Sequence, residues 1–126
     1  MVLFSIQNSI GGEIFVPKIP SYRITDLAKA ICKNCKYKIV GIRQGEKIHE
    51  EMITESDSVS TIDIGKYYVI LPNNKTKFLK YFSKKFKTTN VKKGFKYNSG
   101  TNSNFLTINQ LKLLIKTYVT PYLNSK

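Results

Sequence analysis

The sequence predicts a small α/β lobe of the α+β type, with short strands and three or four helices. Its 126 residues suit one domain or one lobe of a larger protein. With 41% hydrophobic and 12% aromatic residues the chain can build a core, which excludes wholesale disorder. Short strand-like apolar runs alternate with stretches of helical spacing, and none approaches the roughly 18–20 residues of a membrane span.

Five elements are predicted in the first half of the chain. In order, they are a helix over 2–10, a strand over 13–16, a helix over 24–35, a strand over 37–43 and a helix over 46–54. We expect Leu3, Ile6 and Ile10 to form the buried face of the first helix. Ile48 and Met52 are the expected buried residues of the third.

The second half begins with a predicted hairpin and ends with a capped helix. Residues 62–71 form the hairpin across Gly65-Lys66, because glycine at the first turn position suits a type II′ turn. Residues 75–87 place apolar side chains on one helical face and lysines on the other; the apolar ones are Phe78, Leu79, Phe82 and Phe86. The last helix opens with the capping box Thr107-x-x-Gln110 and is expected to end at Pro121.

The charge of the chain is asymmetric. Residues 1–63 hold eight basic and eight acidic side chains, whereas residues 64–126 hold thirteen lysines and no acidic residue. Such a split is typical of proteins that bind nucleic acid or an anionic surface. The basic residues are 19 lysines and only two arginines, Arg23 and Arg43, a profile that equally fits an AT-rich coding sequence.

Three short features carry little functional weight. Gly11-Gly12 is an isolated pair before a strand and not a nucleotide-binding fingerprint. Cys32-x-x-Cys35 lies at the end of a predicted helix and has too few neighbouring ligands for zinc. It therefore indicates two half-buried structural cysteines in a reducing compartment. His49 is expected to be solvated or at the edge of the core.

The most informative segment runs from residue 42 to residue 50. A predicted strand brings Arg43 to its carboxyl end, Gly45 permits a tight turn, and Glu46 opens the next helix. Ligands of α/β proteins bind at such edges, and the planar fork of arginine matches a diphosphate. The carboxylate three residues later can accept hydrogen bonds from sugar hydroxyls. A surface ion pair between Arg43 and Glu46 explains the same two residues and stays open as an alternative.

Three ordered blocks of sequence carry a family resemblance. They are GGEIFVPKIPSYRITDLAKAI, KIVGIRQGEKIHEEMITESDS and YYVILP, within about residues 1–72. Through these blocks the chain resembles the C-terminal part of the polysaccharide-biosynthesis branch of the extended short-chain dehydrogenase/reductases. The most similar members are UDP-N-acetylglucosamine 4,6-dehydratases and related nucleotide-sugar epimerases. A further block over about 95–117, FKYNSGTNSNFLTINQLKLLI, resembles the tail of the longer members more loosely.

The resemblance implies a role in binding a UDP-sugar. In that family an N-terminal Rossmann domain binds NADP and carries the catalytic residues, and the C-terminal lobe closes over the UDP-sugar. The family's R-P-G-E element maps onto Arg43 as a diphosphate ligand and Glu46 as a ribose or uracil-side ligand. Val16 and Lys18 belong to the strand that resembles the lining of the same pocket. Gln44 stands in place of the family's proline, which makes the turn less rigid.

The expected function is that of the UDP-sugar-binding C-terminal fragment of a nucleotide-sugar 4,6-dehydratase, with UDP-N-acetylglucosamine as its sugar. We expect no catalytic residue, metal or cofactor in this chain, because NADP would bind to a missing or separate Rossmann domain. A cytoplasmic location and a homo-oligomeric parent enzyme are also expected. The alternatives are a UDP-sugar 4-epimerase fragment or a basic module for nucleic acid or anionic surfaces, although we expect no specific nucleic acid as partner.

The resemblance also suggests a division of the chain into three segments. Residues 1–72 are the expected UDP-sugar-binding lobe. Residues 73–94 are expected to form a basic linker or amphipathic helix, and residues 95–126 a tail with the terminal helix.

Overall fold

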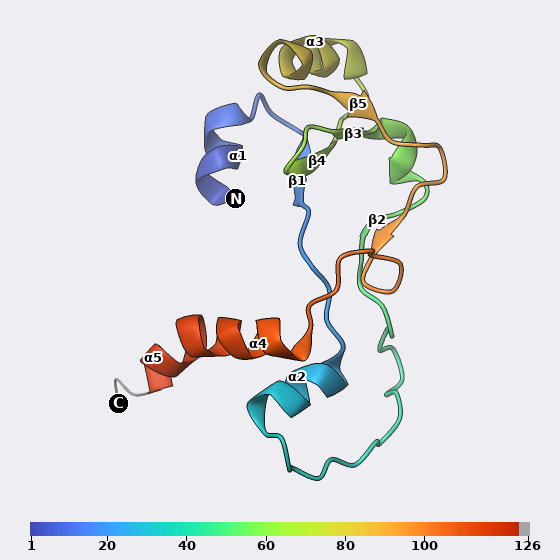
Figure 1. Cartoon of the computed structure of the whole chain (residues 1–126). Helices are drawn as coiled ribbons and strands as arrows, with labels where there is room; N and C mark the ends of the chain where they lie inside the picture. Colours follow the sequence, from blue (N-terminus) through green and yellow to red (C-terminus); the bar gives the residue numbers. More distant parts are fainter. Residues whose placement is uncertain (124–126) are drawn as a thin grey trace. The chain divides into compact units, whose positions relative to one another are not determined.

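The hairpin predicted across Gly65-Lys66 lies at the centre of a sheet in the computed structural model, which describes residues 1–123 (Figure 1). Its strands are β3 (Thr61–Asp63) and β4 (Tyr67–Ile70), paired antiparallel so that Ile62 faces Val69. The Ile64 N–H donates to the Tyr67 carbonyl at 3.0 Å, and Gly65 takes a φ of +94°. The predicted hairpin is therefore confirmed, with glycine where the turn needs positive φ.

Two outer strands complete a four-stranded antiparallel sheet in the order β1-β4-β3-β5. β1 (Ile14–Pro17) pairs with β4, which brings Phe15 opposite Val69. β5 (Thr89–Asn90) pairs with β3 at the other edge. The strand predicted over 13–16 is thus confirmed with a shift of one residue, and Pro17 closes it at an edge, where a missing N–H is tolerated.

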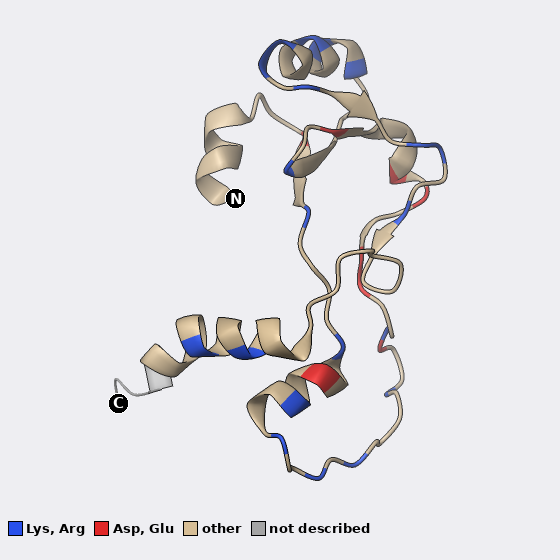
Figure 2. Cartoon of the chain, viewed as in Figure 1, with Lys and Arg blue, Asp and Glu red and all other residues tan. Residues whose placement is uncertain are grey.

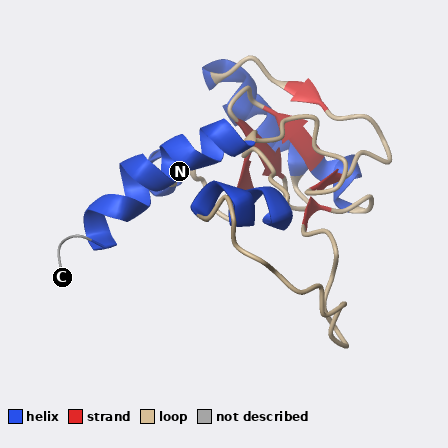
Figure 3. Cartoon of the chain, turned by 60° about the horizontal axis from the view of Figure 1, so that its bottom comes forward, coloured by secondary structure: helices blue, strands red, loops and turns tan. Residues whose placement is uncertain are grey.

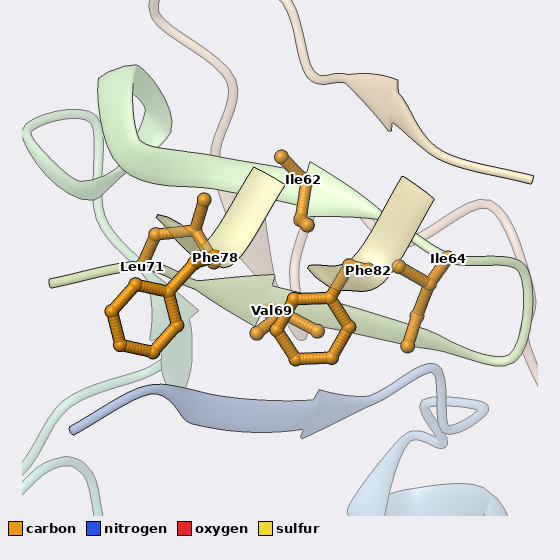
Figure 4. Close-up of a cluster of buried hydrophobic side chains, with 6 residues drawn as sticks. All are labelled: Ile62, Ile64, Val69, Leu71, Phe78 and Phe82. Carbon is orange, nitrogen blue, oxygen red and sulfur yellow. The ribbon is translucent and has the colours of Figure 1, made fainter. Parts of the chain in front are cut away.

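Helix α3 (Lys75–Lys85) packs its aromatic face against this sheet (Figure 4). Phe82 is fully buried and Phe78 is only 5% exposed. Together they cover a core of branched aliphatic side chains from the hairpin and its continuation: Ile62, Ile64, Val69 and Leu71. Leu79 and Phe86 are half-buried against the same cluster. The predicted apolar face of residues 75–87 is therefore confirmed.

The first helix buries a different face from the expected one, although Ile10, beyond its end, packs against the core as expected. α1 (Val2–Asn8) leaves Leu3 and Ile6 more than 70% exposed. Its contact with the core is instead made by Phe4, whose ring stacks on Tyr67 with the centroids 4.5 Å apart. An aromatic ring contributes more buried area than a leucine and has a stacking partner here, which decides the rotation of the helix.

The helix predicted over 46–54 is wrong, because this segment ends in a strand. β2 (Glu51–Ile53) pairs with β6 (Tyr97–Asn98) in a separate two-stranded sheet. Ile53 is fully buried, whereas the two residues expected in the core, Ile48 and Met52, are 73% and 38% exposed. The alternation of strand geometry sends Ile53 inward and Met52 outward. A 3-10 turn, η1 (Asp57–Ser60), connects β2 to the main sheet.

The chain divides into two units that are not contiguous in sequence. The first unit consists of residues 1–19 and 51–101, and the second of residues 20–50 and those from 102 onward. The segment expected as one lobe, 1–72, thus contributes to both units, and α3 belongs to the first. The last three residues of the expected tail, 124–126, lie outside the described residues.

The second unit contains α2 (Ile24–Ile31) and α4 (Ile108–Leu114), which pack together. The predicted capping box is confirmed: the Gln110 N–H donates to Thr107 Oγ1 at 3.3 Å, and the Thr107 N–H donates to Gln110 Oε1 at 2.8 Å. Leu111 is buried, at 4% exposure. α2 ends at Ile31, four residues earlier than expected.

Pro121 does not end the last helix. A π-helical turn, η2 (Ile115–Val119), follows α4 and leads into α5 (Thr120–Leu123), which contains the proline. The Thr120 N–H and hydroxyl both reach the Ile115 carbonyl, the hydroxyl at 3.2 Å. Pro121 is then the second residue of a new helical segment, where a missing N–H costs little.

Residues 33–50 form a long loop between α2 and β2 (Figure 3). The strand predicted over 37–43 is wrong: Ile39, Val40 and Ile42 are 60–83% exposed. No strand in the described part of the chain pairs with them. An apolar run forms a strand only when another strand supplies its hydrogen-bond partners. None of the described helices has the length and apolar character needed to cross a membrane.

We expect Phe82→Ala to lower the free energy of unfolding by about 3–5 kcal/mol, because it opens a cavity in the contact between α3 and the sheet. Phe82 is fully buried, and its ring lies 5.8 Å from that of Phe15. Urea unfolding followed by circular dichroism measures the loss. Lys80→Ala, on the exposed face of the same helix, is the control and should change stability by no more than about 0.5 kcal/mol. Equal effects of the two changes would contradict the packing role of Phe82.

Candidate functional site

Arg43 and Glu46 come together in a tight turn of the loop. The Glu46 N–H donates to the Arg43 carbonyl at 3.1 Å, and the Arg43 N–H donates to Glu46 Oε2 at 3.0 Å. Gly45 takes a φ of +86°, which a residue with a side chain rarely adopts. The predicted turn is therefore present, although no strand leads into it.

The side chains of this turn are open to solvent. Arg43 Nε lies 4.0 Å from Glu46 Oε1, and the two side chains are 85% and 52% exposed. An ion pair at this distance and exposure adds little to stability. The carboxylate mainly caps the backbone of the turn, and the guanidinium fork faces solvent, where it can bind an anion.

The two cysteines form a disulfide, contrary to the expectation of two structural thiols. Cys32 is the residue that follows α2, and it bonds to Cys35 at the start of the loop. Cys32 is half-buried and Cys35 is exposed. The spacing of three residues at the end of a helix lets the chain turn back far enough for the sulfurs to meet. The bond ties the end of α2 to the segment that leads to Arg43.

A second group of candidate residues lies at the end of β1. Val16 is only 4% exposed, so its side chain belongs to the core. Lys18 extends from the end of the strand and binds the Asp63 carboxylate, with Nζ–O distances of 2.6 and 2.7 Å. The same ammonium lies 4.5 Å from the centre of the Tyr68 ring. Lys18 is thus held by an ion pair and a cation–π contact at once.

The phenol of Tyr68 in this cluster has a raised pKa. Burial raises the pKa of its phenol, and the carboxylate of Asp63 and the neighbouring Tyr97 raise it further, against an opposing effect of Lys18. The phenol therefore stays neutral at physiological pH and keeps its ability to donate a hydrogen bond. Tyr97 stacks obliquely on it, with ring centroids 5.4 Å apart, and donates its own hydroxyl to the Ile19 carbonyl at 2.8 Å.

An open depression of about 430 Å³ adjoins this cluster in the first unit. Its lining combines three lysines, one carboxylate, two apolar side chains and two small or polar residues: Lys18, Lys85, Lys87, Asp63, Ile64, Phe86, Gly65 and Thr89. A wall with this composition suits an anionic or hydroxyl-rich molecule.

The predicted site residues therefore fall into two groups. Arg43 and Glu46 belong to the second unit, whereas Val16 and Lys18 belong to the first. Sequence reasoning missed Asp63 and Tyr68, the partners of Lys18. The hairpin register was the available signal, because Asp63 and Tyr68 face each other across β3 and β4.

The residues of the described chain do not fit a dinucleotide or a metal ion. Gly11 and Gly12 lie between α1 and β1, whereas a dinucleotide needs a glycine-rich turn that leads from a strand into a helix. Within residues 1–123 no three histidine, cysteine, aspartate or glutamate side chains are grouped as metal ligands require. His49, the only histidine of the sequence, is exposed.

Comparison with known proteins places the chain in a family. Residues 1–72, more than half of the chain, match the model of a polysaccharide biosynthesis protein family. The chain belongs to this family. The three sequence blocks predicted a protein of polysaccharide biosynthesis, and this prediction is confirmed.

Two kinds of curated relative share the sequence. A UDP-N-acetylglucosamine 4,6-dehydratase (inverting) of Campylobacter jejuni is 45% identical over 105 residues, which is 80% of this chain and 31% of that protein. A UDP-glucose 4-epimerase of Rickettsia canadensis is 35% identical over 88 residues, covering 65% of this chain and 26% of that protein. The chain thus spans about a third or less of the length of these relatives.

A solved structure shares the fold. Pen from Bacillus thuringiensis matches 91% of this chain and 34% of its own, with a TM-score of 0.67 and 21% sequence identity. At that identity the likeness shows the fold alone. It agrees with the small α/β architecture described above.

We expect the Lys18–Asp63 pair to contribute about 1 kcal/mol to stability, because both side chains are about 70% covered and the carboxylate binds with both oxygens. A double-mutant cycle with Lys18→Met and Asp63→Asn, measured by urea unfolding, gives this coupling energy. Lys96–Glu55 is the matched control: it is a more exposed pair at 3.0 Å, and its coupling should be clearly smaller. Equal coupling energies in the two cycles would show that the partial burial of Lys18 does not strengthen its ion pair.

Proposed function

We propose that this chain forms the UDP-sugar-binding part of a nucleotide-sugar 4,6-dehydratase of the UDP-N-acetylglucosamine type. The observation that carries the proposal is the 45% identity to the Campylobacter jejuni dehydratase over 105 residues. That identity is higher than the 35% to the Rickettsia canadensis epimerase. A 4-epimerase fragment of the same family is the second candidate.

Arg43 is the proposed ligand of the diphosphate. The Arg43 side chain is 85% exposed and carries the positive charge of the Arg43–Glu46 turn. An arginine can contact two phosphate oxygens at once. Glu46 has a double task in this proposal: one carboxylate oxygen caps the Arg43 N–H, and the carboxylate can also accept hydrogen bonds from the ribose or the uracil side.

Lys18 and Val16 have supporting roles in the proposal. The Val16 side chain is buried, so its contribution is to fix the end of β1 and not to touch a sugar. Lys18 is held by Asp63 and Tyr68, so its ammonium has a defined position and a partly neutralised charge. A sugar hydroxyl suits such a group better than a free diphosphate does.

The chemical step belongs to residues outside this proposal. A 4,6-dehydratase removes water from its nucleotide sugar, and NADP of the parent enzyme would accept and return the hydride. The residues of this chain do not fit that cofactor, so they are assigned only the binding of the UDP-sugar.

Accordingly, we expect no turnover when the chain alone is mixed with UDP-N-acetylglucosamine and NADP⁺.

We expect Arg43→Ala to weaken binding of UDP-N-acetylglucosamine by about 10- to 150-fold. This range corresponds to the loss of one charge-assisted hydrogen-bond contact, which contributes about 1.5–3 kcal/mol. Arg23→Ala is the matched control, because it removes the only other arginine and Arg23 is also exposed. Isothermal titration of the chain and both variants gives the affinities. Equal affinities of the two variants would remove Arg43 from the site.

The same titration separates the two candidate functions. A dehydratase-type site should bind UDP-N-acetylglucosamine more tightly than UDP-glucose, and an epimerase-type site should show the reverse order. ADP-glucose serves as the control for recognition of the uracil. A chain that binds none of the three sugars would contradict the proposal.

A further inference from the structure

A strongly charged surface of the first unit lies on helix α3 and just beyond its end. Lys77, Lys80 and Lys84 recur at helical spacing within α3, and Lys87 lies two residues after its end. Figure 2 shows basic residues along this helix. All four side chains are exposed. We call these four lysines the basic face. At a rise of about 1.5 Å per residue, its helical part from Lys77 to Lys84 extends about 10 Å.

The sequence that carries these lysines has no acidic residue of its own. Residues 64–126 contain neither aspartate nor glutamate. In the described part of the chain, the carboxylates of the ion pairs engage other cations: Asp63 binds Lys18, and Glu55 binds Lys96. Two neighbouring lysines also have local partners, since Lys75 donates to the Val59 carbonyl and Lys85 to the Tyr81 hydroxyl. The basic face therefore presents four positive charges at one surface.

The helix is fixed beneath this surface. Its opposite side is the aromatic face, where Phe78 and Phe82 are buried against the sheet. The helix therefore has no free apolar side with which to enter a lipid layer. Any partner of the basic face is held by charge, and the lysine stems allow the ammonium groups to adapt to it.

The chemistry of the face favours one class of anionic partner. Base recognition in nucleic acids relies on arginine forks and on exposed aromatic rings that stack on bases. Residues 64–126 contain no arginine, and the phenylalanines of α3 face the core. A layer of anionic lipid headgroups needs neither feature, because it offers many phosphates in one plane to adaptable point charges.

We propose that the basic face of α3 is a docking surface for an anionic membrane, on which the protein lies without inserting. The proposal does not use the residues proposed to bind the UDP-sugar, although Lys87 also lines the depression beside Lys18. Attraction of this kind depends on ionic strength, since the Debye length falls from about 30 Å at 0.01 M to about 8 Å at 0.15 M salt.

The test uses the full chain and sedimentation with vesicles of one part phosphatidylglycerol to two parts phosphatidylcholine. A variant with Lys77, Lys80, Lys84 and Lys87 changed to glutamine should bind at least about 100-fold more weakly, since each lysine near the surface contributes about fivefold. The matched control changes four exposed lysines of the second unit to glutamine: Lys29, Lys33, Lys36 and Lys38. It removes the same charge and should keep most of the binding.

A second variant and a second kind of vesicle separate the effect of charge from loss of the fold. Changing the four lysines of the basic face to arginine should preserve binding, because the charge is kept. Circular dichroism of every variant shows whether the fold is kept. Pure phosphatidylcholine vesicles should not bind the chain, and added salt should release it from the anionic ones.

Three results would overturn the proposal. The first is equal loss of binding in the glutamine variant and its matched control, which would mean that only net charge matters. The second is binding that persists at high salt, which would indicate insertion. The third is tighter binding to duplex DNA than to the vesicles at equal phosphate concentration, which would assign the surface to nucleic acid.

Discussion

The packing of α3 on the hairpin is the contact on which the first unit depends. A sheet whose strands have two to four residues has few hydrogen bonds, and it needs a covering element to bury one face. Phe78 and Phe82 provide that cover over Ile62 and Val69. Phe4 of α1 joins the same aromatic group through Tyr67 and Phe86. The lysine-rich half of the chain is thus not an addition to the fold, because its helix completes the core.

This arrangement also orders the residues around β1. Because β4 is held between β1 and β3, Tyr68 lies opposite Asp63 on one side and Val16 on the other. Lys18, just beyond the end of β1, reaches both the carboxylate and the ring. Backbone pairing therefore places the Asp63 carboxylate beside the Tyr68 phenol, and side-chain contacts with both hold the Lys18 ammonium. The Arg43–Glu46 turn is built differently, since only its own hydrogen bonds and a glycine define its shape.

The turn and the helix start that sequence reasoning predicted correctly have local causes. Gly65 dictates the hairpin turn, and Thr107 with Gln110 dictates the start of α4, so each can be recognised from a few neighbouring residues. The apolar run around Ile39 and the first helix depend on distant partners. Strand pairing and the choice of Phe4 over Leu3 are decided by tertiary contacts, which periodicity alone does not contain. For the same reason the turn at Gly45 was predictable, whereas the grouping of Lys18 with Asp63 and Tyr68 was not.

The non-contiguous units have a consequence for how the chain can be divided. Residues 1–32 contribute β1 to the first unit and α2 to the second. The residues after the loop contribute β4, which pairs with β1, and α4, which packs on α2. Backbone hydrogen bonds join the parts in each unit: β1 pairs with β4, and Ser21 exchanges bonds with Asn104 and Leu106 at 2.8 Å. A protease that cuts the exposed loop between residues 36 and 50 would therefore produce two peptides that stay associated. The loop is a natural break for split-protein complementation, in which two inactive pieces restore one fold when they are mixed.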